Sequence, residues 1–265
     1  MFRRFRIAIL LYILLFVALG QFLAARRSTD WNSPLWVNVY LVNEQDSPET
    51  ERYLDSLEPD AFAGIERFFA AEAGRYGVAL EEPFRIHLAD RLESAPPAAP
   101  VDDGWLAVVA WSLRMRWFVT RLHWSSDSPT PDISLFAIYE DGGHGGALDR
   151  STALRKGMIA VARLYAERRM HGSNQMIVAH ELLHTLGASD KYNFASGLPM
   201  HPAGYAAPDA KPRYPQAKAE LMAGRIPLDR DAAAVPESLA QVVIGPATAF
   251  EIGWIEDLPQ VLGSR

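Results

Sequence analysis

The segment from His180 to Asp190 constrains the fold of this chain more than any other, because it combines metal-binding side chains at helical spacing with a turn. Its sequence is HELLHTLGASD. Residues four apart on an α-helix lie about 40° apart around the axis and about 6 Å apart along it, so His180 and His184 can bind one cation together. Glu181 lies beside this pair, not between the two ligands. The segment therefore predicts a helix that carries a metal site.

The flanking sequence is typical of a buried helix that ends at Gly187. The residues around the two histidines are apolar on nearly every side. We expect Ser173 to cap the N-terminus and Gly187 to end the helix with a left-handed backbone. The chain can then turn back and bring Asp190 to the metal as a third ligand. Three protein ligands leave one position open for water, as in catalytic zinc sites, whereas structural zinc sites have four.

This segment resembles the metzincin clan of zinc peptidases, and most closely its snapalysin-type branch, whose motif is HExxHxxGxxD. The match is residue by residue at His180, Glu181, His184, Gly187 and Asp190. The resemblance implies one zinc ion held by the two histidines and the aspartate, with Glu181 as the general base that takes a proton from water. It implies an endopeptidase that hydrolyses peptide bonds.

Further positions fit the same family. Tyr192 matches a tyrosine two residues past the third ligand, where it would donate a hydrogen bond in the transition state or orient Asp190. Residues 220–224 resemble the segment that carries the family's methionine turn, so Met222 is expected beneath the zinc as an apolar floor. Met200 is the competing methionine. Most metzincins have histidine where this chain has Asp190, so the ligand set follows one branch of the clan.

Two alternatives stay open. Another clan of zinc peptidases takes a downstream glutamate as third ligand, and Glu220 would serve there, although that scheme gives no reason for Gly187 and Asp190. The chain would otherwise be a catalytically silent zinc-fold module for binding or assembly in the cell envelope. Glu181 favours the enzyme, because a silent module gains nothing from burying that charge.

Composition bounds the remaining possibilities. The chain has 265 residues, 49% of them hydrophobic, which is enough for one sizeable core. Its net charge of −6 provides no basic surface, so we expect no nucleic-acid partner. The chain contains no cysteine. A cysteine-based latency switch and disulfides are therefore excluded.

A hydrophobic segment near the N-terminus predicts an uncleaved signal-anchor. Residues Ile7 to Ala25 form 19 uncharged positions, long enough for a transmembrane helix across a hydrocarbon core of about 30 Å. Arginines precede the segment, which would place the rest of the chain outside the cytoplasm, in the periplasm or at the cell surface. A cleaved signal peptide and a secreted protein are the alternative. Leu23 and Arg26 argue against cleavage, because neither suits its position around the cut.

The remaining pattern predicts an α/β (α+β) fold with a metzincin-like arrangement. Residues 1–27 would form the cytoplasmic stub and anchor, and residues 28–265 the peptidase domain. A mixed-sheet subdomain over about residues 28–187 would carry the active-site helix, and residues 188–265 would form a smaller, irregular subdomain. The predicted strands are 35–41, 84–88 and 133–140; the predicted helices are 48–76 with a break at Pro59, 105–122 and 245–253; residues 158–164 are strand or helix.

Three stretches are expected to lie near substrate or membrane. Ile133–Glu140 precedes the zinc helix, where the family has its edge strand, so an extended peptide substrate is expected to add to it. The proline-rich residues 195–218 would wall the pocket for the side chain after the cut bond, as in the resembling family. Residues 105–122, apolar with arginines, are expected to pack on the sheet as an amphipathic helix, with a position on the membrane surface as the alternative.

Overall fold

The computed structural model describes residues 29–100, 104–125, 130–141, 152–154 and 158–258. The predicted anchor, Ile7 to Ala25, lies outside these residues. No helix within the described ranges is long and apolar enough to cross a membrane.

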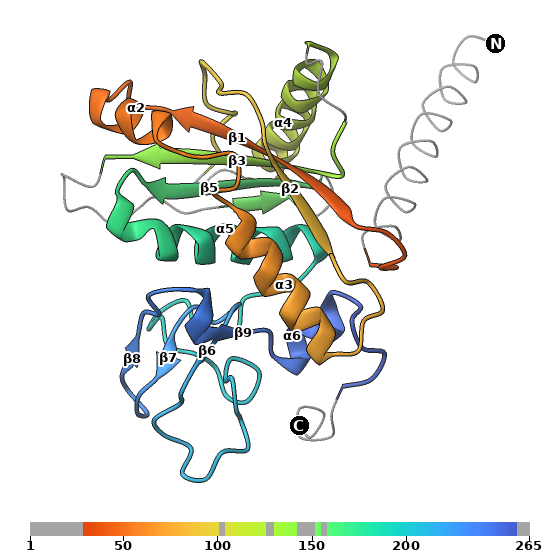
Figure 1. Cartoon of the computed structure of the whole chain (residues 1–265), viewed down its shortest axis with the longest axis vertical. Coiled ribbons are helices and arrows are strands. Elements are labelled where there is room, and N and C mark those ends of the chain that lie inside the picture. The colour runs from red at the N-terminus through yellow and green to blue at the C-terminus, as the bar shows by residue number, and fades with distance from the viewer. Residues whose placement is uncertain (1–28, 101–103, 126–129, 142–151, 155–157, 259–265) are drawn as a thin grey trace.

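A mixed sheet of five strands forms the centre of the protein (Figure 1). Four neighbouring strands run parallel, and the last one is antiparallel to its neighbour. The predicted α/β class is confirmed. Across the sheet the order is β2 (Phe84–Leu88), β1 (Leu35–Asn43), β3 (Ile133–Glu140), β5 (Ile159–Tyr165) and β4 (Thr152–Leu154).

The prediction that Ile133–Glu140 is the edge strand is wrong. This strand, β3, lies between β1 and β5 and pairs with both in parallel. Its residues from Ile133 to Tyr139 are all buried, as in a strand covered on both faces. Parallel strands are joined by crossover connections, so order along the chain does not set order in the sheet. The antiparallel β4 takes the edge position instead.

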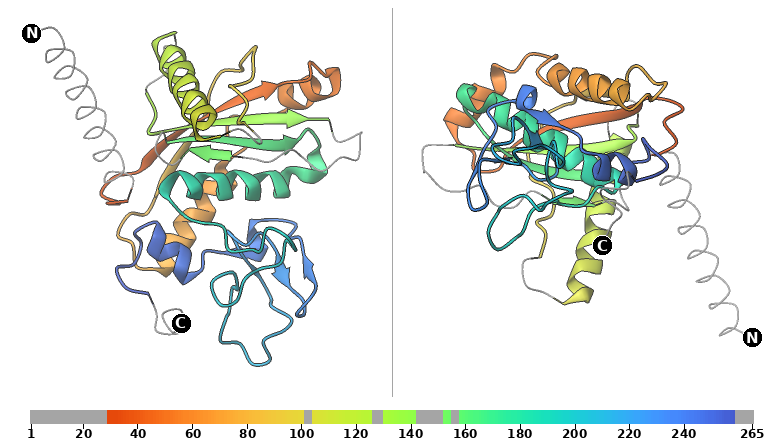
Figure 2. Two further views of the ribbon diagram at one scale, coloured as in Figure 1. Left: turned by 180° about the vertical axis from the view of Figure 1, so that it is seen from behind. Right: turned by 90° about the horizontal axis from the view of Figure 1, so that it is seen from below.

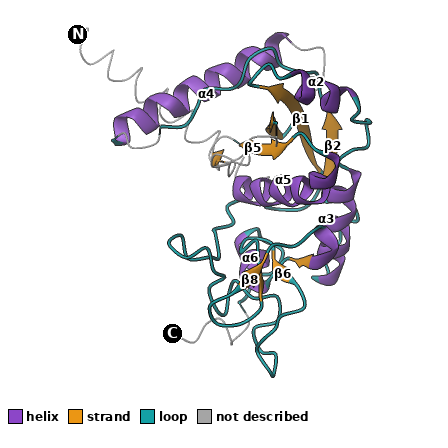
Figure 3. Cartoon of the chain, turned by 90° about the vertical axis from the view of Figure 1, so that its left-hand side faces the viewer, coloured by secondary structure: helices purple, strands orange, loops and turns teal. Residues whose placement is uncertain are grey.

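Helices cover both faces of the sheet, as Figure 3 shows. α4 (Trp105–Ser125) packs on one face, and α3 (Ala63–Arg75) and α5 (His171–Leu186) pack on the other. Neighbouring residues of β3 show the division: Phe136 belongs to the small buried cluster beneath α4, whereas Leu135 belongs to the large one beneath α5. The predicted packing of the 105–122 helix on the sheet is confirmed.

The predicted helical stretch after β1 forms two helices. α2 (Pro48–Asp55) is capped at its N-terminus by Ser47, whose Oγ accepts a hydrogen bond from the amide of Thr50 at 3.4 Å. Pro59 lies in the break before α3, as expected. Beyond α3, the Tyr76 hydroxyl donates to the carbonyl of Ile244 at 2.7 Å, which joins this helix layer to the C-terminal part.

After α5 the chain forms short elements that lie beneath this helix in Figure 1 and in the left view of Figure 2. Their buried residues, such as Met222 and Ile252, belong to the same cluster as the sheet. The described elements before and after α5 therefore share one main core, and α4 packs in the smaller cluster on the other face of the sheet. The short elements are β6 (Ala219–Glu220) paired with β9 (Val242–Val243), β7 (Ile226–Pro227) paired with β8 (Ala233–Ala234), the 3-10 turn Leu239–Gln241, and α6 (Pro246–Glu251), which begins after Gly245 as predicted.

Candidate metal centre

α5 carries both histidines and is fixed to the sheet near its start. The Asn174 side chain donates to the carbonyl of Tyr165 at 2.8 Å and accepts from its amide at 3.0 Å. The helix starts at His171, and the 3-10 turn Arg168–Met170 runs directly into it. The prediction of Ser173 as N-cap is therefore wrong, because the helix has already begun at that position.

Gly187 ends α5 in the left-handed conformation, with φ at 104°. The amides of Gly187 and Ala188 donate to the carbonyl of Leu183 at 3.1 and 3.0 Å, which closes the last turn. A residue with a β-carbon would be strained at this φ. The turn reverses the chain and brings Asp190 back toward the helix.

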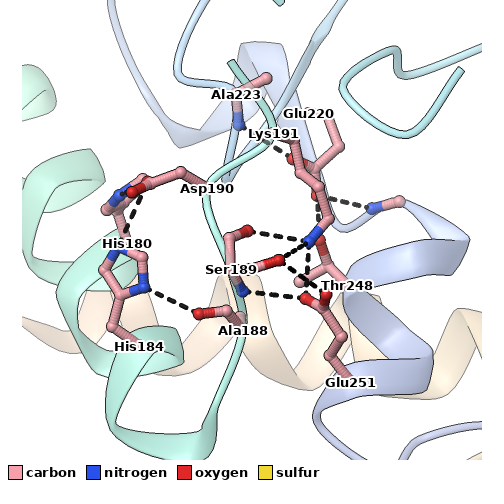
Figure 4. Close-up of polar contacts among 11 residues, drawn as sticks. His180, His184, Ala188, Ser189, Asp190, Lys191, Glu220, Ala223, Thr248 and Glu251 are labelled. Atoms are coloured by element: carbon pink, nitrogen blue, oxygen red, sulfur yellow. Dashed lines mark hydrogen bonds and ion pairs between the residues drawn. The ribbon is translucent and has the colours of Figure 1, made fainter. Parts of the chain in front are cut away.

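The side chains of His180, His184 and Asp190 converge on one point (Figure 4). Asp190 Oδ1 lies 3.1 Å from Nε2 of His180 and 3.3 Å from Nε2 of His184. The exposed fractions of these side chains are only 18–21%. One oxygen and two nitrogens thus share a small, mostly buried space.

The other ring nitrogens define the protonation of the histidines. His180 Nδ1 lies 3.1 Å from the carbonyl of Leu221, and His184 Nδ1 lies 2.8 Å from the carbonyl of Ala188. A carbonyl oxygen only accepts, so each Nδ1 must carry a proton and donate it. In the neutral ring, Nε2 then presents a lone pair. Two lone pairs and a carboxylate oxygen face one another, which is stable only with positive charge between them.

The pKa shifts of Asp190 and His180 also indicate that positive charge is stabilised between these side chains. Burial alone raises the pKa of Asp190, but the contacts with His180 and His184 outweigh it and hold this pKa well below its usual range. Burial alone lowers the pKa of His180, yet Asp190 and Glu181 hold it above its usual value. The site attracts positive charge, and protons compete with a metal ion for its lone pairs. These residues fit zinc, whose usual ligands are imidazole nitrogen and carboxylate oxygen.

Glu181 lies next to the converging atoms. Its side chain is buried, and its Oε2 has no hydrogen-bond partner in the described part of the chain. Burial raises the pKa of this carboxyl. Candidate ligand atoms of His180, Glu181 and His184 lie within 4.8 Å of one another, so distance alone admits Glu181 as a ligand. Asp190 is the better third ligand, because one of its oxygens faces both Nε2 atoms and Glu181 then stays available as a base.

The structure separates the two candidate methionines. Met222 is fully buried, and its neighbour Leu221 accepts the hydrogen bond from His180. Met200 is 44% exposed on the surface. Tyr192 lines the cleft that opens from the candidate metal centre, and the centroid of its ring lies 5.1 Å from that of Phe194. The expected positions of Met222 beneath the histidines and of Tyr192 beside Asp190 are both compatible with this geometry.

Glu220, the alternative third ligand, is engaged elsewhere. Its Oε1 accepts from the amide of Gly245 at 3.2 Å and from the Thr248 hydroxyl at 2.6 Å, and its Oε2 accepts from the amide of Ala223 at 3.0 Å. The carboxylate therefore joins the Met222 turn to the start of α6. Nothing in this geometry supports it as a ligand.

An ion pair between the buried Lys191 and the partly exposed Glu251, which the sequence did not reveal, holds the segment around Asp190. Lys191 Nζ donates to Glu251 Oε2 at 2.6 Å and to the carbonyl of Ser189 at 2.8 Å. The Ser189 amide and hydroxyl donate to the same glutamate at 2.9 and 2.7 Å (Figure 4). The Lys191 amide also donates to the carbonyl of Met222 at 2.9 Å. Both neighbours of Asp190 are thereby fixed.

The converging atoms open into a cleft of about 780 Å³. Arg163, which pairs with Glu140 at 2.6 Å, lies along it. No residue of 195–218 lines this cleft, contrary to expectation. That stretch is folded on itself by Gln216, whose side chain bonds backbone groups of Ala207 and Arg213. The apolar lining consists of Met170, Met176, Ile177, Tyr192, Phe194, Leu221, Val235 and Val242.

The arrangement can hold one divalent cation on a side open to a cleft, next to a buried carboxylate that can accept a proton. Comparison with models of protein families and with curated proteins finds no match to this chain. What the site does is therefore inferred from its own residues and their geometry.

Proposed function

We propose that the chain is a zinc-dependent endopeptidase with a metzincin-like fold. The convergence of Asp190 Oδ1 with two histidine Nε2 atoms, whose Nδ1 atoms face carbonyls, is the observation that carries the proposal. The left-handed turn at Gly187 and the buried Met222 support the metzincin-like assignment. The strand β4, which lies at an edge of the sheet and precedes α5 in the chain, also fits it.

His180, His184 and Asp190 would hold the zinc ion. When bound, zinc would supply a Lewis acid that polarises the peptide carbonyl and lowers the pKa of the attacking water. Glu181 would accept the proton of this water at Oε2 and then deliver it to the leaving amine. Its raised pKa suits this exchange, because an acid–base group works best when its pKa approaches the working pH. Tyr192 would donate a hydrogen bond to the developing oxyanion.

Substrate would bind in extended form along β4, which replaces Ile133–Glu140 in this role. β4 is the last strand of the sheet within the described residues, and it lies beside α5. An edge strand offers backbone donors and acceptors that an extended peptide can satisfy. The apolar lining of the cleft, including Ile177 and Val242, favours a substrate with an apolar side chain next to the cut bond.

Residues 7–25 would hold this activity at the membrane, with the catalytic domain outside the cytoplasm. Only a few polar residues separate the segment from the described domain. The substrates would therefore be envelope proteins or membrane-proximal segments. If the N-terminal segment is cleaved, the enzyme is secreted, and an intact N-terminus in the membrane fraction distinguishes the two cases.

Metal content and peptide cleavage measured together on the purified full chain test the proposal. We expect about one zinc per chain, and cleavage that a chelator abolishes. Glu181→Gln should keep the zinc and lose nearly all turnover, whereas His184→Ala should lose the zinc. His87→Ala, an exposed histidine far from the motif in sequence, is the matched control and should change neither.

Two results would contradict this function. Zinc retained in full by His184→Ala would remove the ligand assignment. Zinc bound by a wild-type chain that cleaves no member of a diverse peptide library would favour the alternative, a catalytically silent zinc-fold module of the cell envelope.

A further inference from the structure

α4 lies over one face of the sheet, with its other side turned away from the sheet (Figure 3), and it carries several exposed apolar side chains. Its inner side is buried, with Met115 and Val119 packed on the sheet. At 100° per residue, five of the seven exposed large apolar residues of α4 fall together on the opposite side, whereas Trp105 and Val108, in its first turn, lie outside this group. We call the group of five the outer stripe: Leu106, Val109, Leu113, Trp117 and Trp124, with exposed fractions of 64%, 46%, 63%, 62% and 77%.

Arginines border the outer stripe on both sides. The helical spacing puts Arg116 about 70° to one side of its centre, and Arg121 and Arg114 about 70–90° to the other. The helix from Trp105 to Ser125 contains no acidic residue, although the whole chain has a net charge of −6. α4 is thus apolar at the centre of its exposed face and positive along both margins.

These features favour a membrane over a protein as the partner. A second copy of the chain packed through the outer stripe would bring the arginines of the two copies toward one another, with no acidic residue in α4 to compensate. A bilayer with anionic lipid offers phosphates to the arginines and an apolar boundary to the stripe. Tryptophan is enriched at this boundary. The rings of Trp117 and Trp124 pack edge to face, with 6.1 Å between their centroids.

We infer that the outer stripe of α4 lies in the headgroup region of a membrane that contains anionic phospholipid, with the helix parallel to the surface. The inference does not depend on the proposed peptidase activity. It agrees with the hydrophobic segment Ile7 to Ala25, which would bring the chain to the same surface. Because α5 packs on the other face of the sheet, the sheet would then stand between the membrane and the candidate metal centre.

A spin label on the outer stripe tests the inference. The chain has no cysteine, so Leu113→Cys creates a single labelling site in the full chain. Leu228→Cys is the matched control, because Leu228 is also an exposed leucine and lies next to β7. The labelled chains are reconstituted in vesicles of phosphatidylcholine alone and of an equimolar mixture with phosphatidylglycerol. The accessibility of each label to oxygen, which dissolves in the bilayer, and to a water-soluble nickel chelate is then measured.

In the mixed vesicles, the label at position 113 should be more accessible to oxygen than to the nickel chelate, and the label at position 228 should show the opposite order. In phosphatidylcholine alone, the preference for oxygen at position 113 should fall. If the nickel chelate reaches position 113 as freely as position 228 in both kinds of vesicle, the inference is wrong.

Replacing arginines of α4 by glutamate tests whether their charge contributes to membrane binding. Arg114→Glu combined with Arg121→Glu should move the label at position 113 into water in the mixed vesicles, since each basic residue near an anionic surface contributes roughly five-fold to binding. Arg213→Glu combined with Arg230→Glu, two exposed arginines in the C-terminal part, should leave the label in the bilayer. An equal effect of both pairs would show that net charge, and not α4, governs the contact.

A protein partner would give a different signal. A label at position 113 that neither reagent reaches in either kind of vesicle would show that protein covers the stripe and would overturn the inference. Spin–spin broadening that disappears on dilution with unlabelled chain would identify a second copy. A label that is shielded from both reagents without spin–spin broadening would indicate that residues 7–25 of the same chain cover the stripe. All of these readouts are spectroscopic and need neither zinc nor turnover, so they stand apart from the test of the peptidase.

Discussion

Lys191 Nζ lies 2.6 Å from Glu251 Oε2, and this contact joins the segment after α5 to the last helix of the structure. The lysine is only 5% exposed and the Glu251 side chain 29%, so the lysine depends on this glutamate more than on water to balance its charge. Glu251 also accepts two hydrogen bonds from Ser189. The residue between the two held positions is Asp190. The third acceptor of the candidate metal centre is therefore positioned through Lys191 by a residue 60 places after that lysine.

Glu251→Gln should weaken zinc binding by about 10–100-fold, because it leaves the Lys191 charge buried without its partner and loosens the segment that carries Asp190. Competition with a chelator of known affinity measures the change. Glu256→Gln, an exposed glutamate after α6, is the matched control. If the double variant Lys191→Met, Glu251→Gln binds zinc more weakly than Glu251→Gln by the same factor again, the two residues act independently and the positioning role is refuted.

The ligand assignment predicts that alanine and histidine at position 190 have different effects on zinc binding. Asp190→Ala should lose zinc during purification, since two histidines alone leave the site with only two protein ligands. Asp190→His should retain it, because an imidazole nitrogen can replace the carboxylate oxygen as a zinc ligand. Elemental analysis of both variants measures the outcome, with Asp257→Ala, an exposed aspartate, as control. Full zinc content in Asp190→Ala would move the third ligand to another residue, and Glu181 would be the first to test.

The attachment of α4 to the sheet should depend on pH. Burial lowers the pKa of His123 from its usual value of 6.5, and the ring lies 3.1 Å from the Ser134 hydroxyl of β3. A lowered pKa in the folded state means that the unfolded state binds more protons in acid. The stability that His123 contributes is therefore present above about pH 6.5 and is lost as the pH falls through the folded value.

Hydrogen exchange of residues 105–125 should consequently accelerate on acidification, after correction for the intrinsic rate. His123→Gln should remove this dependence, because glutamine keeps a polar group that does not titrate. His87→Gln, an exposed histidine on β2, should leave it unchanged. An identical pH profile in wild type and His123→Gln would assign the effect to other groups.

Two glycine substitutions should have opposite effects on stability. A β-carbon at Gly245 would lie 2.8 Å from Cγ of the buried Glu220, so Gly245→Ala should destabilise the protein by about 1–3 kcal/mol. A β-carbon at Gly74, in α3, meets nothing within 4 Å. Gly74→Ala should stabilise by about 0.5–1 kcal/mol, because alanine favours helix. Urea unfolding measures both, and a stable Gly245→Ala would mean that the Glu220 network rearranges without loss.

The part of the site within eleven neighbouring positions, from His180 to Asp190, was predictable because helical geometry and a glycine turn determine it locally. The contacts that orient it were not. Leu221 accepts from His180, and Glu251 holds Lys191, and neither partner lies within 40 residues of its contact. No periodicity in the sequence links positions so far apart.

The fold shows the same limit. The strands from Leu35 and Phe84 and the helices after Ser47 were predictable, because each follows from a local pattern of apolar residues or a cap. The central position of Ile133–Glu140 was not, because strand order depends on crossovers between distant segments. The cleft was missed for a similar reason: Val235 and Val242 meet α5 only through the tertiary fold.

The dependence of Asp190 on Glu251 also bears on when the centre matures. Synthesis proceeds from the N-terminus, so a nascent chain contains both histidines and Asp190 about 60 residues before it contains the glutamate that fixes their arrangement. Until α6 has docked, the lysine lacks its counter-charge and the third acceptor its fixed position. Competence for metal would then follow the docking of α6. In a chain without cysteine, this order of assembly would itself delay activity until Glu251 has been synthesised and α6 has docked.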